Sequence, residues 1–270
     1  MEIKQVKLIY FSPTGTTQKV LESIAEGIAA NDVEHINLTL PEGAKETIAP
    51  FSDELVIIGA PVYGGRLPVD AIHRFKQLKA SKTLAILIVV YGNREFEDAL
   101  LELKNLAIEL GFIPVAGGAF IGEHSFATKD APIASGRPDS LDVQKAMELG
   151  AKIKEKTAAL RSPDAQMDLK VSGLFPYVAG GARPMAVAPA ANEDTCTVCG
   201  TCASVCPTAA ISINGSVATN VDQCIRCCAC IKNCPTGAKV WEDSKMKNMA
   251  VLLSQYFYYP KEPRIFGIDM

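Results

Sequence analysis

All nine cysteines of the 270-residue chain lie between Cys196 and Cys234. No other feature constrains the fold as strongly, because thiols crowded in this way bind metal ions or form disulfides. The same stretch contains too few large apolar residues for a core of its own. We therefore expect its stability to depend on the groups that the thiols bind.

The cysteines form two copies of one pattern, C-x2-C-x2-C-x3-C followed by proline, which end at Pro207 and Pro235. Cys228 has no position in this pattern, and we expect it to bind no metal. Structural zinc is the alternative, because C-x2-C pairs are common in zinc sites, but zinc gives no reason for two copies of the longer pattern. The candidate metal ligands are Cys196, Cys199, Cys202, Cys206, Cys224, Cys227, Cys230 and Cys234.

The stretch from about residue 192 to residue 242 resembles the bacterial-type ferredoxins that hold two [4Fe–4S] clusters. In that template the fourth cysteine of each run binds the other cluster. The resemblance therefore implies one cluster on Cys196, Cys199, Cys202 and Cys234. It implies a second cluster on Cys206, Cys224, Cys227 and Cys230.

The first 160 residues show a different pattern, in which strand-like apolar runs alternate with helical stretches. The runs cover residues 6–11, 33–38, 55–60, 83–91 and 112–121, and the last helical stretch covers 141–160. This alternation predicts an open parallel sheet with helices on both faces. Ligands of such sheets bind at the carboxyl ends of the strands, where we expect the loops to carry the site.

The loop SPTGTT, residues 12–17, joins the first strand to the first helix. Free amides at a helix N-terminus attract anions, and hydroxyl donors together with a glycine let the backbone approach one closely. The loop lacks the lysine of a nucleotide-triphosphate loop, so a single phosphate suits it better. An ordinary helix cap is the alternative. The candidate phosphate-binding residues are Ser12, Thr14, Gly15, Thr16 and Thr17.

Two further loops, PVYGGRLP and YGNREFED, follow the third and fourth strands. Together with SPTGTT they resemble flavodoxin, whose cofactor is FMN and whose five parallel strands take the order 2-1-3-4-5. The resemblance implies that Tyr63 and Tyr91 stack on the flavin ring, and Arg66 and His124 are further candidates for contact with it. The predicted ring-binding residues are Pro61, Val62, Tyr63, Gly64, Gly65, Tyr91, Gly92, Asn93 and Asp98.

The whole chain resembles proteins in which a flavodoxin is fused to a ferredoxin, with GAFIGEHSF and PIASGRPD as further matching stretches. The resemblance implies FMN and two [4Fe–4S] clusters in one chain. We expect a flavodoxin-like domain over residues 1–162 and a linker over 163–192. A small α+β two-cluster ferredoxin domain over 193–242 and a helix with an aromatic tail over 243–270 follow.

A flavin accepts one or two electrons and a cluster accepts one, so the predicted function is intracellular electron transfer between the clusters, FMN and redox partner proteins. An FMN-dependent reductase of a small molecule is the alternative. The net charge of −3 and the lack of a basic block argue against nucleic acid. No apolar run is long enough to span a bilayer, and no leader is visible, so we expect a cytoplasmic protein. The sequence leaves a homodimer open.

Overall fold

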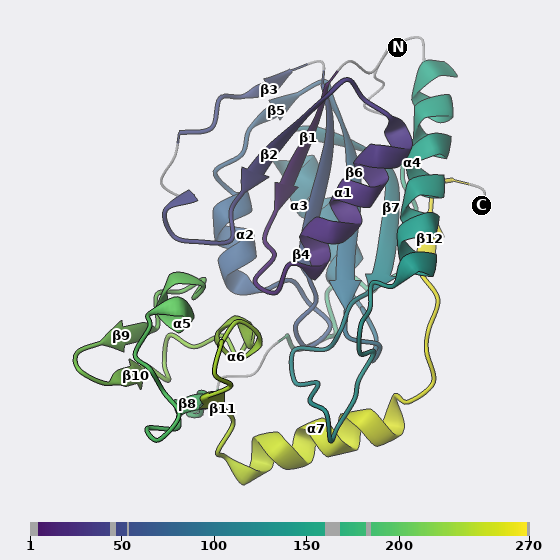
Figure 1. The fold of residues 1–270 in the computed structure, drawn as a ribbon. Helices are drawn as coiled ribbons and strands as arrows, with labels where there is room; N and C mark the ends of the chain where they lie inside the picture. Colours follow the sequence, from purple (N-terminus) through teal and green to yellow (C-terminus); the bar gives the residue numbers. More distant parts are fainter. Residues whose placement is uncertain (1–4, 44–46, 53, 160–167, 182–184, 269–270) are drawn as a thin grey trace.

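A six-stranded sheet with helices on both sides forms the centre of the computed structural model (Figure 1). The structure describes residues 5–43, 47–52, 54–159, 168–181 and 185–268. Five strands run parallel in the order β2-β1-β4-β6-β7, and β12 pairs antiparallel with β7. The strands are β1 (Gln5–Tyr10), β2 (Asp32–Asn37), β4 (Leu55–Pro61), β6 (Thr83–Tyr91), β7 (Phe112–Ile121) and β12 (Arg264–Phe266).

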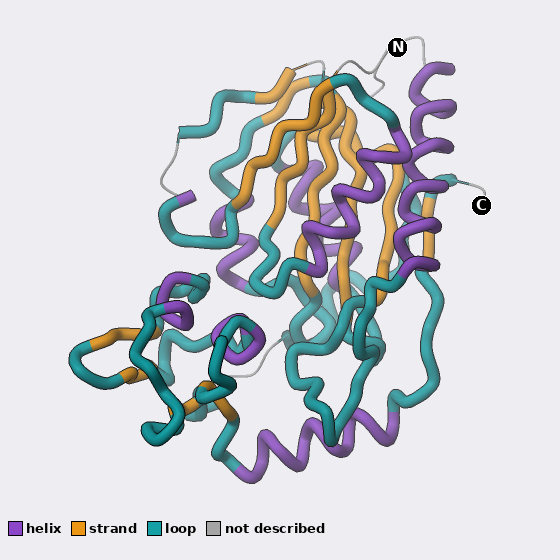
Figure 2. The backbone as a smooth tube through the Cα atoms, viewed as in Figure 1, coloured by secondary structure: helices purple, strands orange, loops and turns teal. Residues whose placement is uncertain are grey.

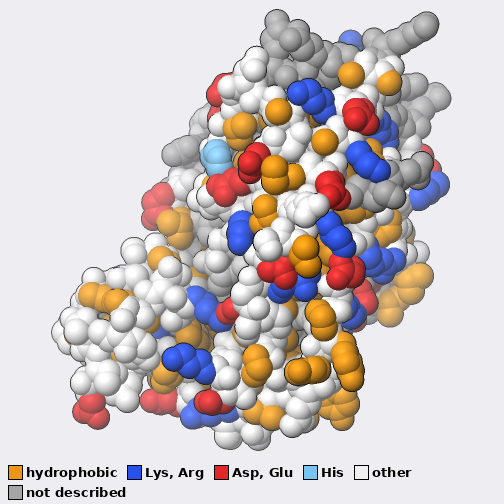
Figure 3. All heavy atoms as spheres, turned by 45° about the vertical axis from the view of Figure 1, so that its right-hand side comes forward, with side chains coloured by type: hydrophobic (Ala, Val, Ile, Leu, Met, Phe, Trp, Pro, Cys, Tyr) orange, Lys and Arg blue, Asp and Glu red, His pale blue; other side chains and the backbone are white. Residues whose placement is uncertain are grey.

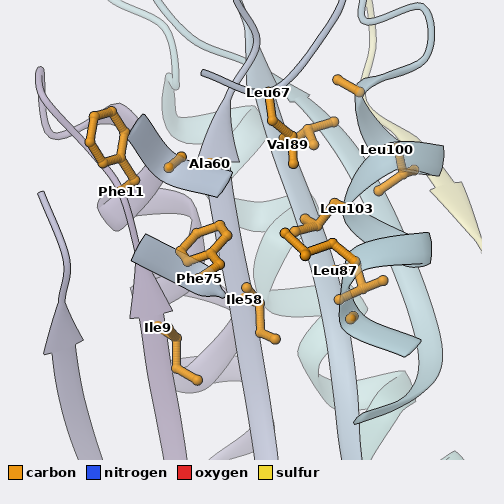
Figure 4. Close-up of a cluster of buried hydrophobic side chains, with 14 of the residues drawn as sticks. Ile9, Phe11, Ile58, Ala60, Leu67, Phe75, Leu87, Val89, Leu100 and Leu103 are labelled. Atoms are coloured by element: carbon orange, nitrogen blue, oxygen red, sulfur yellow. The ribbon is translucent and has the colours of Figure 1, made fainter. Parts of the chain in front are cut away.

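Both faces of the sheet are covered, because successive side chains of a strand point to opposite faces. On β6, Leu87 and Val89 pack in a cluster with α2 (Val69–Phe75) and α3 (Ala99–Glu109), which Figure 4 shows. Ile86 and Ile88 pack on the opposite face with α1 (Thr16–Ile28) and α4 (Ser140–Ala159). All nine residues of β6 are buried, which explains its unbroken apolar sequence.

The predicted flavodoxin-like α/β fold is confirmed, but the sheet is not limited to the five predicted strands. The aromatic tail supplies the sixth strand, with Arg264 opposite Ala119 and Phe266 opposite Gly117. This pairing was not predicted, because it joins segments that lie far apart in the sequence. Two short strands, β3 (Phe51–Ser52) and β5 (Ala80–Ser81), pair in parallel as a separate two-stranded sheet.

Residues 188–243, which we call the cysteine module, lie beside the carboxyl ends of the parallel strands (Figure 1). Loops make up most of the module (Figure 2), with two antiparallel strand pairs and two helices of one turn. Its elements are β8 (Ala190–Ala191), α5 (Thr201–Ser204), β9 (Ile211–Ile213), β10 (Val217–Thr219), α6 (Ala229–Lys232) and β11 (Lys239–Val240).

The segments on either side of the cysteine module pack against the sheet domain. Asp98 accepts hydrogen bonds of 2.8 Å from the amides of Leu174, Val178 and Ala179, which lie in the predicted linker. Residues 163–167 and 182–184 of that linker lie outside the described residues. Beyond the module, Asp243 caps α7 (Ser244–Tyr256), since its carboxylate accepts from the Met246 amide, and the chain then returns to the sheet. None of the helices in the described ranges is long and apolar enough to cross a membrane.

Candidate cofactor sites

The loop after β1 has the features of an anion site. Ser12 is held in place, since its amide donates to Thr39 Oγ1 at 2.8 Å and its Oγ accepts from the Gln18 amide at 3.1 Å. Gly15 precedes α1 with φ of 80°, in the left-handed region that favours glycine. Thr17 Oγ1 is buried and has no hydrogen-bond partner among the described residues. A buried hydroxyl without a partner at a helix N-terminus suits a phosphate oxygen.

A cavity of about 340 Å³ extends from this loop along the ends of β4, β6 and β7. Two of the predicted phosphate-loop residues line it, as do six of the predicted ring residues. Residues of the sheet domain and of the cysteine module both line it. The predicted residues in its wall are Thr14, Thr16, Pro61, Val62, Tyr63, Gly64, Tyr91 and Gly92.

The cysteine module, the segment before it and α7 also contribute to the wall. Ile225 and Arg226 come from the second cysteine run, Met185 from the segment before the module, and Met249 from α7. Burial raises the pKa of the Tyr63 hydroxyl, and the charges of Cys227, Cys228 and Asp70 add to that rise. Sequence reasoning missed this wall, because no local pattern shows which distant segment covers a loop.

Two predicted ring residues have their polar groups engaged elsewhere. The buried Asn93 donates to the carbonyls of Phe257 and Tyr259 and accepts from the Lys261 amide, which anchors the C-terminal tail. Asp98 anchors the predicted linker, as described above. Gly65 lies against Glu97 and Ala179, outside the cavity wall. The side chains of Asn93 and Asp98 thus attach other segments of the chain to the sheet domain.

Arg66 and Tyr91 also make close contacts with other side chains of the chain. Arg66 pairs with the Glu102 carboxylate and lies over the Tyr177 ring, with its guanidinium carbon 4.1 Å from the ring centroid. Tyr91 is buried, and its ring packs against Phe96 with centroids 5.6 Å apart. Burial raises the pKa of Tyr91 to about 12. Arg66 is not among the residues that line the cavity, whereas Arg226 is.

His124 lines the cavity from the loop after β7. Burial lowers its pKa to about 4, and the charges of Arg94 and Lys232 act in the same direction. The ring is therefore neutral at pH 7, and its Nδ1 accepts the Phe126 amide at 3.0 Å. A neutral imidazole whose Nδ1 accepts must carry its proton on Nε2, which leaves an N–H donor at the ring's other nitrogen.

The cysteines gather around two small cavities of about 20 Å³ each. The first is lined by Cys196, Cys199, Cys202 and Cys234, which we call the outer set. The second is lined by Cys206, Cys224, Cys227 and Cys230, the inner set, together with Cys228. Within the described residues, no three Cys, His, Asp or Glu side chains lie close enough to share a single metal ion. The four template thiols of each set therefore surround a cavity and do not converge on the position of a single metal ion.

The two cysteine runs repeat the same backbone conformation. Val198 and Arg226 have φ of 54° and 57°, and Gly200 and Cys228 have φ of 85° and 61°. Gly200 precedes α5 and Cys228 precedes α6. Cys228 thus occupies the position of Gly200 in the other run, and its buried thiol packs with Trp241 and Met246.

The two sets differ in their surroundings. Cys199 of the outer set is exposed, whereas Cys227 and Cys230 of the inner set are buried. Burial raises the pKa of the Cys230 thiol to about 12. Ile225 lines both the cavity of the inner set and the larger cavity at the sheet. The inner set is therefore the neighbour of the larger cavity.

Comparisons with known proteins divide the chain in the same way. A family model described as a flavodoxin domain matches residues 7–123, and one described as a 4Fe-4S dicluster domain matches residues 188–235. A search of curated proteins found no match.

Three solved structures illustrate the similarity. A flavodoxin from the domain Archaea aligns with 16% identity and a TM-score of 0.37, over 57% of this chain and 99% of its own. Fusobacterium nucleatum flavodoxin bound to flavin mononucleotide aligns with 14% identity and a TM-score of 0.39, over 57% and 99%. A flavodiiron core from Synechocystis sp. PCC6803 aligns with 23% identity and a TM-score of 0.39, over 57% of this chain but 36% of its own.

The chain is a flavodoxin domain joined to a 4Fe–4S dicluster domain. This fused flavodoxin–ferredoxin architecture confirms the prediction made from the motifs. The first domain implies FMN as cofactor, and the second implies iron–sulfur clusters. The residues present suit both groups, because the loop at Thr17 offers an unpaired buried hydroxyl and each cysteine cavity is lined by four template thiols.

Proposed function

We propose that the chain is a cytoplasmic electron-transfer protein that passes electrons between two [4Fe–4S] clusters and FMN, and to or from redox partner proteins. The observation that carries the proposal is the shared wall: the second cysteine run lines the cavity that the flavodoxin loops form. A reducing compartment is supported by nine cysteines that form no disulfide in the described chain.

The proposal gives each group of residues a role. The outer set holds the cluster that lies nearer to solvent and exchanges electrons with partners. The inner set holds the cluster beside the flavin cavity. The phosphate loop, with Thr14, Thr16 and Thr17, holds the phosphate, and Tyr63, Gly64 and Gly92 contact the ring. When bound, FMN supplies two-electron capacity and each cluster supplies one-electron capacity.

An anaerobic reductive titration of the purified chain, followed by visible absorption, tests this proposal. Two clusters and one flavin predict uptake of about four electrons per chain, with iron at about eight atoms per chain. Uptake of about two electrons, with no flavin bands, would contradict the assignment of FMN. Stoichiometric zinc in place of iron would contradict the assignment of the clusters.

An FMN-dependent reductase fed by the clusters is a second candidate, which one observation favours. His124 and Ser125 line the flavin cavity, and His124 presents a proton on Nε2. In a reductase, His124→Gln should slow reduction of a small electron acceptor more than it slows transfer to a one-electron protein acceptor. Equal effects on both would leave electron transfer as the function.

A further inference from the structure

Lys239, on β11, is a buried lysine in the cysteine module. Its side chain is 2% exposed, and its ammonium donates to Thr219 Oγ1 at 2.7 Å. It forms no ion pair within the described part of the chain. A buried charge is costly unless other charges compensate for it, and a hydroxyl supplies little compensation. The compensating negative charge must therefore come from something other than a carboxylate.

The hydrogen bonds around Lys239 fix the direction of the ammonium. The Thr219 hydroxyl donates to the Pro189 carbonyl at 3.1 Å, so that its lone pairs are left to accept from Lys239. Both strands that carry these residues are paired, β10 with β9 and β11 with β8. The paired strands of the cysteine module and the hydrogen bond to Thr219 thus hold the Lys239 side chain in one position.

Thiols of both sets lie within reach of the lysine's charge. Lys239 lines the cavity of the outer set. Thr219, whose Oγ1 lies 2.7 Å from the Lys239 ammonium, lines the cavity of the inner set. The ammonium consequently acts on both cluster sites.

We propose that Lys239 is a counter-charge shared by the two cluster sites and raises the reduction potential of both clusters. This inference rests on the proposed function, because it takes the two sets to hold clusters. Thiolate-ligated clusters carry net negative charge, which grows when they accept an electron, and net charge is one of the determinants of their potential. A fixed positive charge stabilises the reduced state more than the oxidised state.

The experiment is a redox titration of the cofactor-loaded protein, with each cluster followed by electron paramagnetic resonance. Lys239→Met and Lys239→Gln remove the charge, and Lys239→Arg keeps it. Lys245→Met, at an exposed position of α7, is the control for loss of a lysine. The flavin couple is an internal reference, since Lys239 does not line the flavin cavity.

Both neutral variants should shift both cluster couples to more negative potential. We expect at least a tenfold change in each one-electron reduction equilibrium, which corresponds to about 59 mV. Lys239→Arg and Lys245→Met should stay close to the wild-type potentials. Loaded neutral variants with unchanged potentials, or a shift confined to one cluster, would overturn the inference.

Cluster loading is measured first, by iron content. If both neutral variants fail to load while Lys239→Arg loads fully, the requirement for the charge is supported. If Lys239→Arg fails as well, the site needs the shape of lysine, and the inference is wrong. A wild-type chain that binds no iron would instead contradict the proposed function itself.

Discussion

At the scale of single residues, His124 links the flavin cavity to the stability of the fold. Its ring packs on Gly92 so closely that a Cβ on that glycine would lie 2.3 Å from His124 Cδ2. The ring also contacts Phe126, whose own ring meets Trp241 of the cysteine module edge-on. Protonation of a ring enclosed in this way requires the desolvation of a positive charge.

We therefore predict that acid destabilises the protein through His124. An unfolded histidine has a pKa of about 6.5, whereas burial lowers the pKa of His124 to about 4. Between these values the unfolded state binds a proton that the folded state does not, so stability falls as pH falls. His124→Gln should remove about 1–2 kcal/mol of the stability difference between pH 7.5 and pH 5.

Thermal unfolding at the two pH values, followed by circular dichroism, measures this effect. His73→Gln, at an exposed position of α2, is the matched control and should keep the wild-type difference. An unchanged pH dependence in His124→Gln would show that His124 is accessible to protons in the folded state.

At the scale of elements, the repeated conformation of the two cysteine runs explains the ninth cysteine. Cys228 stands where the other run has Gly200, in a left-handed conformation that glycine adopts without strain. We predict that Cys228→Gly retains about eight iron atoms per chain. Iron and sulfide analysis measures this, with Cys227→Gly as the control that loses iron. Loss of iron in Cys228→Gly comparable to that control would make Cys228 a ligand.

The attachment of the C-terminal tail depends on the buried Asn93, which hydrogen-bonds Phe257, Tyr259 and Lys261. Asn93→Ala leaves these backbone groups without their partner and should cost about 2–4 kcal/mol. We predict that trypsin then cleaves after Lys261 on the order of ten times faster, as the tail opens locally. Asn248→Ala, at an exposed position of α7, should cleave at the wild-type rate. Equal rates for the two variants would mean that β12 holds the tail without Asn93.

At the scale of the whole molecule, buried and charged contacts fix the cysteine module against the sheet domain. The Arg74 guanidinium donates to the carbonyls of Leu38 and Thr39 in the sheet domain and of Pro207 in the module. Lys232 of the module pairs with Glu123 and donates to the Ala127 carbonyl at 2.9 Å. On the face that Figure 3 draws, basic and acidic side chains are interspersed.

We predict that Arg74→Met slows electron transfer from the clusters to the flavin by several-fold while iron and flavin contents stay unchanged. The variant leaves three carbonyls without their charged donor, each worth about 1.5–3 kcal/mol, so the module loses its fixed position. Stopped-flow reduction, followed at the flavin band, measures the rate. Lys76→Met, at an exposed position after α2, is the control. A wild-type rate in Arg74→Met would show that the remaining contacts suffice.

Local sequence patterns predicted the parallel strands of the sheet and the two cysteine runs. The strands of the sheet are continuous apolar runs, and the cysteine runs have fixed spacings, so both are visible within a few residues. Asn93, Asp98 and Arg66 have partners that lie 168, 76 and 36 residues away, so no local pattern could predict these contacts. Their residue types suit a flavin loop as well as an anchor, and only the folded chain reveals the anchoring contacts.

The return of the chain to the sheet also determines when the fold can be completed. β12 covers the outer edge of β7, yet it follows the entire cysteine module in the sequence. During synthesis on the ribosome, that edge stays open until the module and α7 have emerged. An uncovered strand edge can pair with another chain, so the nascent protein carries an aggregation-prone edge for as long as its redox module is being made.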